Sequence, residues 1–171
     1  TLDLDEIKSK ESIILTSLQG SYALEKASKH AHIQTLTKTI NNINCHAKIY
    51  LDHMFDTDPI SVKLEVKTHT KNGDLAVNIS IGVRVDYKGN RDIPIGPMSG
   101  GEKQRINLAL LLAINDLFGS NIILLDECLN NLHKKISLET LEFLKELCPN
   151  KQIIVVSHDD IGGECDNVME L

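Results

Sequence analysis

The sequence lacks the features that mark several large protein classes. It contains no Trp and has an aromatic content of 4%, while 42% of its 171 residues are hydrophobic and 25% are charged. Those fractions exclude a disordered or collagen-like chain and are typical of one folded domain. The longest unbroken apolar run, 108–114, is far shorter than the roughly 20 residues that a membrane-spanning helix needs. The first residues show no signal-peptide pattern, so we expect an intracellular protein without a membrane segment.

Positive charge and closely spaced cysteines are also scarce. The chain has 24 acidic against 18 basic residues, for a formal net charge of −6. A domain whose bulk charge attracts nucleic acid is usually basic, so any DNA contact must come from a local patch or from parts of a longer chain. The four cysteines contain no Cys-x-x-Cys pair, which indicates reduced thiols and not a disulfide frame or a zinc site.

A phosphate-binding Walker A loop is missing as well. Gly96 and Gly101 have the four-residue gap of such a loop, which continues Gly-Lys-Ser/Thr. Here Glu102 follows the second glycine, Lys103 comes one place late, and Gln104 offers no hydroxyl for magnesium. Two prolines in the preceding segment also argue against a central strand. The glycines of this segment therefore do not belong to a Walker A loop.

Residues 1–55 are helical in character, and Asp56–Pro59 ends the helical region. Two interpretations stay open: one amphipathic helix packed on a domain, or the end of a longer coiled coil that enters a globular head. Both interpretations rest on apolar residues that recur in alternating steps of three and four positions, as at the interface of a coiled coil. Its clearest members are Ile33, Leu36, Ile40, Ile43, Ala47, Tyr50 and Met54.

Strands are predicted next. Residues 62–66 alternate apolar and polar side chains, Asn72-Gly73 is a strong hairpin signal, and the odd positions from Leu75 to Tyr87 are all apolar. A second turn at 88–91 follows. We expect a β-hairpin with one buried face.

From residue 98 the pattern becomes α/β. It predicts a helix over 100–118, a strand over 122–125 buried on both faces, a helix over 136–148, a strand over 153–156, and a third strand from Val168. Alternating strands and helices indicate a parallel sheet.

The residues with chemical potential lie at the start of the first helix and at the ends of the strands. Ser99 and Glu102 form a capping-box pattern that places Gly100 and Gly101 in the first helical turn. A helix N-terminus presents unpaired N–H groups and a partial positive charge, which together favour phosphate. A capped helix without further function would explain this motif if it stood alone.

Two strand ends add polar groups. Asp126 and Glu127 end the first apolar run, and Ser157 and His158 end the second. The carboxyl ends of parallel strands form the edge where α/β folds bind ligands. In phosphoryl-transfer sites one acid of such a pair holds magnesium, and the other orients or deprotonates the attacking water.

In this order, Met98–Glu102, Asp126-Glu127 and Ser157-His158 resemble the signature motif, Walker B motif and switch histidine of an ABC-type ATPase. The separation of 27 between Ser99 and Asp126 is longer than we expect for transporters. It resembles that of structural-maintenance-of-chromosomes (SMC) heads and of the related ATPase subunit of the double-strand-break repair nuclease complex. The upstream heptads fit such heads, which sit at the base of long coiled coils.

The resemblance implies an α/β fold, namely the C-terminal half of an ABC-type P-loop ATPase head. Residues 1–55 would be the end of a coiled coil, and 56–171 the C-terminal lobe. The implied partners are an N-terminal Walker A lobe, a second head that completes a dimer, DNA, and in the repair branch a nuclease subunit. The implied cofactors are ATP and Mg²⁺.

Residue roles follow from the same resemblance. Ser99–Gly101, with Glu102, would bind the ATP held by the opposite head. Asp126 would hold the magnesium shell, Glu127 would be the general base, and His158 would contact the γ-phosphate in its own head. The implied reaction is ATP hydrolysis that opens and closes a two-headed dimer acting in DNA repair, recombination or chromosome organisation.

Two positions depart from the family pattern. Met98 replaces a Leu, a change that conserves volume. His133 stands where the loop after Walker B usually ends in Asp, which puts coupling between the two sites of a dimer in question. An alternative is therefore a scaffold that joins coiled coils without hydrolysis, although such a relic has no need of Glu127. A transporter ATPase is a third alternative, disfavoured by the heptads and the motif spacing.

Overall fold

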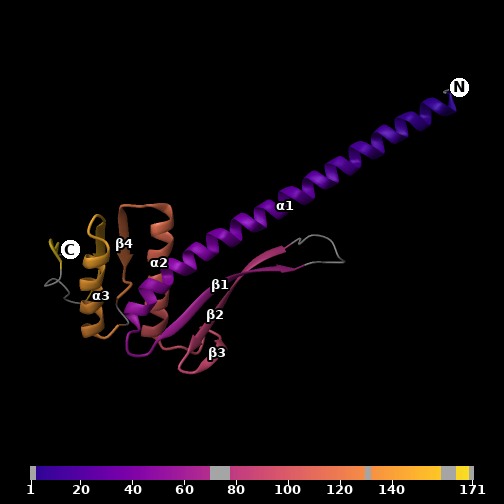
Figure 1. Cartoon of the computed structure of the whole chain (residues 1–171). Helices are drawn as coiled ribbons and strands as arrows, with labels where there is room; N and C mark the ends of the chain where they lie inside the picture. Colours follow the sequence, from indigo (N-terminus) through magenta and orange to yellow (C-terminus); the bar gives the residue numbers. More distant parts are fainter. Residues whose placement is uncertain (1–2, 70–77, 130–131, 159–164, 170–171) are drawn as a thin grey trace. The chain divides into compact units, whose positions relative to one another are not determined.

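The computed structural model describes residues 3–69, 78–129, 132–158 and 165–169 (Figure 1). The chain divides into two compact units. One comprises residues 1–39 and 66–81, and the other comprises residues 40–65 and 82–171. The second unit carries every predicted site residue. Within the part of the chain that is described, no helix combines the length and the apolar character needed to span a bilayer.

Helix α1 (Leu4–Met54) confirms the predicted helical region. Its last part, from Ile40, belongs to the second unit, and there the apolar repeat is buried. This segment therefore behaves as an amphipathic helix packed on a domain. Upstream, Leu4, Ile7 and Leu18 are exposed. A coiled-coil partner for that part stays a prediction.

A three-stranded sheet follows, in the order β1 (Ile60–His69), β2 (Asn78–Tyr87), β3 (Asn90–Ile93). Strands β2 and β3 are antiparallel. Lys88 and Gly89 join them with φ values of 51° and 79°. Positive φ at both central residues is the geometry of a two-residue type I′ turn, which confirms the second predicted turn.

Among the described residues of β2, the predicted buried face of the hairpin is covered in part. Val85 and Tyr87 are buried, whereas Ile79, Ile81 and Val83 are exposed. Period-2 alternation identifies one face of a strand, but it does not show how much of that face meets other side chains. The predicted Asn72-Gly73 turn lies outside the described residues.

The α/β part contains α2 (Gly100–Phe118), β4 (Ile122–Asp126), α3 (Lys134–Leu147) and β5 (Gln152–Val156). Strands β4 and β5 are parallel, so the predicted parallel pairing is confirmed. Residues 165–169 are not a strand, and the predicted third strand from Val168 is wrong for these residues.

The β4–β5 sheet is covered on one face only by the described residues, which corrects the prediction of burial on both faces. Ile123 and Leu125 are 2% and 0% exposed, whereas Ile122 and Leu124 are 55% and 60% exposed. An all-apolar run has the same sequence pattern whether one or both of its faces are covered.

The C-terminal end of α2 is joined to other elements through Asp116. The Tyr50 hydroxyl of α1 donates to this carboxylate at 2.5 Å, and Lys151 Nζ, just before β5, donates at 2.7 Å. Burial raises the pKa of Asp116, but the hydrogen bonds from Lys151 and Tyr50 outweigh it, so the pKa lies below its ordinary value. The carboxylate is therefore charged at neutral pH and links three segments that are far apart in the sequence.

Candidate functional site

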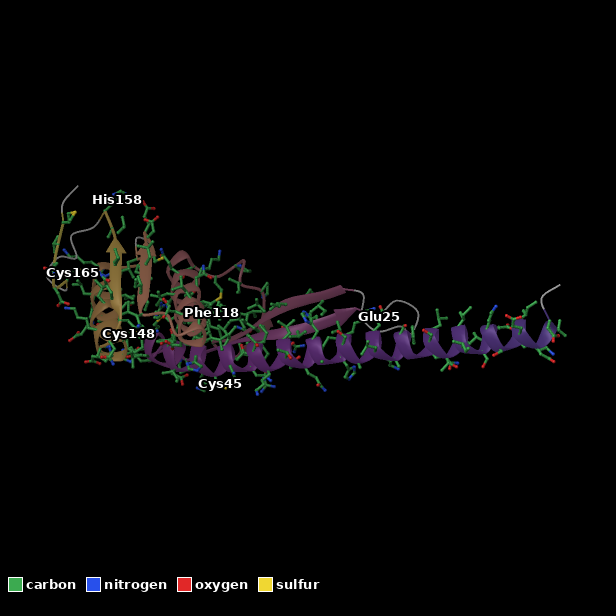
Figure 2. All side chains as sticks on the ribbon, turned by 90° about the horizontal axis from the view of Figure 1, so that it is seen from above. Glu25, Cys45, Phe118, Cys148, His158 and Cys165 are labelled. Carbon is green, nitrogen blue, oxygen red and sulfur yellow. The ribbon has the colours of Figure 1, made fainter. Side chains whose placement is uncertain are left out.

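The parallel pairing of β4 with β5 brings two predicted site residues together. Asp126 pairs with Val156, so the residues that follow each strand emerge at the same edge of the sheet. There Nε2 of His158 lies 2.8 Å from Oε1 of Glu127. Figure 2 labels His158 at the end of β5, and the two side chains are 80% and 56% exposed. This acid–histidine pair is open to a ligand from outside the chain.

The backbone of Glu127 is held in an unusual conformation. Its φ of 50° lies in the left-handed region, which residues other than Gly seldom adopt. Its N–H donates to the carbonyl of Val156 at 3.0 Å, and its carbonyl accepts from Nε2 of Gln104 at 3.2 Å. Gln104 was not a predicted site residue, because a single polar residue on a helix carries no pattern that indicates such a contact.

The N-terminal end of α2 has the predicted capping box. The Ser99 hydroxyl accepts from the backbone N–H of Glu102 at 3.3 Å, and the Glu102 carboxylate accepts from the backbone N–H of Ser99 at 2.9 Å. That backbone hydrogen bond lowers the pKa of Glu102, so the cap is charged at neutral pH. Gly100 and Gly101 begin the helix, where the first amide N–H groups have no intrahelical partner.

The side chain of Asp126 is exposed at the end of β4. Across the described residues, no group of three or more His, Cys, Asp or Glu side chains is arranged to hold a metal ion. One exposed carboxylate is a donor set that suits Mg²⁺, because this ion keeps several waters and binds through one or two carboxylates and substrate phosphates.

His133, which stands where the family pattern has Asp, lies at the start of α3. His133 is the exposed N-cap residue, and its side chain makes no capping hydrogen bond to the described part of the helix. Asn130 and Asn131, which precede it in the departing loop, lie outside the described residues. The helix therefore begins without the side-chain cap that an Asp would supply.

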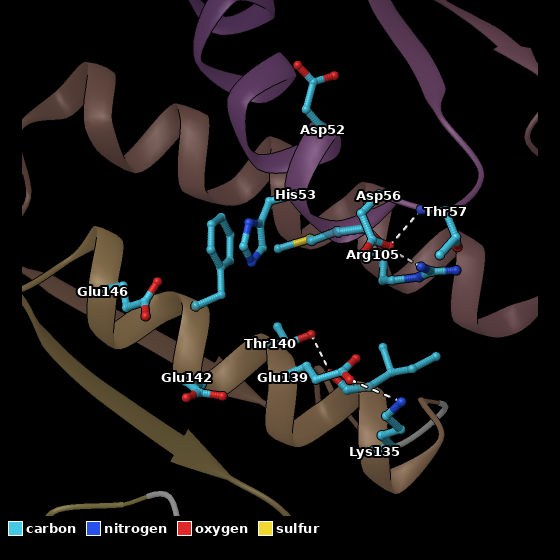
Figure 3. Close-up of a pocket in the computed structure, with 13 residues that line it drawn as sticks. Asp52, His53, Asp56, Thr57, Arg105, Lys135, Glu139, Thr140, Glu142 and Glu146 are labelled. Carbon is cyan, nitrogen blue, oxygen red and sulfur yellow. Dashed lines mark hydrogen bonds and ion pairs between the residues drawn. The ribbon is translucent and has the colours of Figure 1, made fainter.

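A cavity of about 730 Å³ lies elsewhere in the second unit, between the end of α1 and one face of α3 (Figure 3). Arg105 of α2 is one of the residues that line it. Its Nη1 donates to the carbonyl of Met54 at 2.5 Å, and its Cζ lies 4.0 Å from the centroid of the Phe55 ring. None of the predicted site residues is among the described side chains that line this cavity.

No family model matches the chain, but individual proteins and solved structures do. The chain is 31% identical to protein 094L of invertebrate iridescent virus 3 over 144 residues, which is 82% of this chain. It is 28% identical to protein 050L of invertebrate iridescent virus 6 over 159 residues, or 89% of this chain. It spans only 16% and 15% of the length of these two relatives.

The chain is also 29% identical over 133 residues to the thiamine import ATP-binding protein ThiQ of Haemophilus influenzae, covering 75% of this chain and 57% of that protein. Among solved structures, an SMC head domain with a coiled coil and joint from Pyrococcus yayanosii superposes with a TM-score of 0.63 at 22% identity. The match covers 94% of this chain and 30% of that one. Over most of its length the chain therefore has the fold of part of an SMC head domain.

A second structure supports the same fold. It comes from work on ATP-driven dimerization and DNA-stimulated activation of SMC ATPases, and it has a TM-score of 0.61 at 19% identity, with 79% of both chains covered. The α/β architecture expected from the motif order is therefore confirmed. The chemical roles of the individual residues remain proposals.

Proposed function

We propose that this chain is the C-terminal lobe of an SMC-like ATPase head and that it hydrolyses ATP once a Walker A lobe and a second head complete its sites. The observation that carries the proposal is the 2.8 Å contact between Glu127 and His158 at the end of two parallel strands. Histidine and carboxylate at one sheet edge are suited to orienting water and contacting a terminal phosphate.

Each residue of the edge has a role in this proposal. Glu127 accepts a proton from the attacking water, and His158 holds the γ-phosphate beside it. Asp126 holds Mg²⁺ through its water shell, and the ion would neutralise charge on the phosphate oxygens when bound. The residues Ser99–Gly101 offer helix N–H groups to a nucleotide held by the opposite head, with Glu102 fixing the cap.

The exposed face of the β4–β5 sheet supports a Walker A lobe as partner. Ile122, Leu124, Ile154 and Val156 are all exposed on these two strands. A contiguous apolar sheet face is typical of a buried interface, and parallel sheets are normally covered on both faces. The missing phosphate-binding loop would arrive with the covering lobe.

The proposal extends to the setting in which the complete protein acts. The heads of SMC-type proteins and the upstream heptads favour a dimer that acts on DNA in repair, recombination or chromosome organisation, inside the cell, with a nuclease subunit as a further partner in the repair branch. The matched viral relatives are far longer than this chain, which agrees with a head that belongs to a larger polypeptide. The uncapped start of α3 at His133 favours one alternative, a scaffold with a relic head that does not hydrolyse ATP.

ATP-dependent dimerisation of the complete protein tests the proposal. Wild-type protein should hydrolyse ATP and form dimers with ATP, as measured by phosphate release and light scattering. Ser99→Arg places a bulky side chain at the cap, where the second head must dock, so it should still bind ATP but neither dimerise nor hydrolyse it. Ser9→Arg, on an exposed part of α1, is the matched control.

The outcomes separate the candidates. An inert wild-type protein that still dimerises would favour the scaffold. Ser99→Arg protein that dimerises with ATP as wild type does would show that Ser99 is only a helix cap. This chain alone, without a Walker A lobe, should bind Mg-ATP no better than weakly, and micromolar affinity in calorimetry would contradict the need for that lobe.

A further inference from the structure

Gln104 connects the helix that begins after Ser99 to the residue that follows β4, Glu127. It lies on α2, five residues after Ser99, and its amide Nε2 donates to the main-chain carbonyl of Glu127 at 3.2 Å. Ser99 and Gly100 at the capped end of α2 are exposed, and Glu127 directly follows β4. One side chain therefore joins the helix that begins at Ser99 to the backbone of the carboxylate at the strand edge.

The backbone conformation of Glu127 requires support from neighbouring residues. Its left-handed conformation, with φ at 50°, is costly for a residue with a Cβ atom and persists only where its surroundings fix it. Two hydrogen bonds supply that support from opposite sides of the residue. The N–H is bound to Val156 of β5, and the carbonyl is bound to Gln104 of α2.

The direction of the Glu127 side chain depends on this backbone geometry. Its carboxylate reaches Nε2 of His158 at 2.8 Å with both side chains largely exposed, so within the described part of the chain the carboxylate is not packed in a core. A change in the Glu127 backbone would move the carboxylate relative to His158. Displacement of a catalytic group by about 1 Å can lower a rate by two orders of magnitude.

We propose that Gln104 is a positioning residue for the general base Glu127, and that it couples the placement of this base to the helix that carries Ser99. The inference rests on the proposed function, in which Ser99 meets nucleotide held by the opposite head while Glu127 acts on nucleotide in its own head. Helix α2 then links the two sites of a dimer through one amide. It offers this link although the loop after Walker B departs from the family pattern at His133.

Steady-state kinetics of the complete protein test this role. Gln104→Ala removes the donor, and we expect kcat to fall about 10-fold while the KM for ATP and ATP-dependent dimerisation stay unchanged. Gln104→Glu keeps the shape but replaces the donor by a carboxylate facing the Glu127 carbonyl, so its kcat should fall further. Gln34→Ala, an exposed glutamine of α1, is the matched control and should match wild type.

A double-mutant cycle distinguishes positioning from a general structural effect. If Gln104 acts through the Glu127 carboxylate, Gln104→Ala should have no further effect on the residual hydrolysis of Glu127→Gln protein. A general loss of structure would instead lower the residual rate again and would lower the thermal midpoint of both variants.

Three outcomes would overturn the inference. Gln104→Ala and Gln104→Glu proteins with wild-type kcat would remove the positioning role and leave the proposed ATPase function standing. Additive effects in the Glu127→Gln background would assign Gln104 a role that does not pass through the base. Wild-type protein without ATPase activity would overturn the proposed function, and the positioning role with it.

Discussion

The two ends of helix α2 are held in different ways. At the N-terminal end, Ser99 and Glu102 bond to each other within one turn, and Gln104 makes one longer link to Glu127. At the C-terminal end, Asp116 binds Tyr50, 66 residues away, and a lysine 35 residues away. The cap at Ser99 is formed within one turn, although Arg105 in the next turn reaches the carbonyl of Met54. The carboxylate of Asp116, by contrast, is bound by two distant segments of the fold.

Taken with the proposed function, this difference leads us to expect that the Asp116 end of the helix matters for stability and the Ser99 end for function. Long-range bonds to a half-buried carboxylate contribute to the folded state as a whole, because breaking them leaves a charge without its partners. A locally capped end can present its amide groups to another molecule without loosening the domain. Substitutions at the two ends should therefore have separable effects.

The largest effect is expected at Glu127, which follows β4 and which Gln104 links to the N-terminal part of α2. Glu127→Gln keeps the shape of the side chain and removes the proton acceptor, so ATP turnover of the complete protein should fall at least about 100-fold. ATP binding should persist, and dimers should accumulate with ATP. Glu142→Gln, an exposed glutamate of α3, is the control. Unchanged turnover in Glu127→Gln protein would place the base elsewhere.

The next effect concerns stability at the anchored end. Asp116→Asn removes the charge that Lys151 and Tyr50 bind, and we expect it to lower the free energy of unfolding by about 2 kcal/mol. Chemical denaturation of the complete protein measures this loss, with the exposed Asp3→Asn as control. The kcat of the folded fraction should not change. A loss of turnover without a loss of stability would reverse the assignment of the two ends.

A smaller stability effect is expected at the cap. Ser99→Ala removes one hydrogen bond to the first turn and should cost about 1 kcal/mol. It should nevertheless weaken ATP-dependent dimerisation more than Asp116→Asn does. Light scattering with titrated ATP, performed on both variants, makes the comparison. Equal dimerisation by the two proteins would contradict a special role of the capped end.

The smallest effect is a dependence of stability on pH. Because the folded-state pKa of Asp116 is depressed, its stabilising contribution is present above the unfolded value of about 3.9 and is lost as pH falls through the folded pKa. Denaturation midpoints between pH 5 and 3 should therefore decline less steeply for Asp116→Asn than for wild type. Glu102 contributes in the same direction, since its pKa is lowered as well. Parallel declines for wild type and Asp116→Asn would exclude Asp116 as a source of the acid sensitivity.

Much of the α/β part could be predicted from sequence because its signals are local. Capping at Ser99 depends on residues three places apart, and the meeting of Glu127 with His158 follows once two apolar runs are parallel strands. The Asp116 contacts could not be predicted, because they join residues whose spacing in sequence carries no pattern. The role of Gln104 was equally hidden, since its partner is a backbone carbonyl.

The covered and exposed faces of β4 show a further limit of periodicity. Ile123 and Leu124 are both apolar and adjacent, yet they differ in exposure by more than half of their surface. Neither residue type nor spacing separates them, because both faces of a parallel strand are normally apolar. The pattern of a strand therefore does not show whether its second face is covered by its own chain or by a partner.

The exposed face of the β4–β5 sheet also decides how this chain will behave when it is made by itself. Leu124 and Ile154 are paired residues of the two strands and are both exposed, so the two strands present one continuous apolar surface. Such surfaces drive self-association and precipitation. Recovery of soluble material therefore serves as a direct assay for docking of the companion lobe: co-production should raise the yield, and Leu124→Lys should raise the yield of the lone chain while lowering it for the pair.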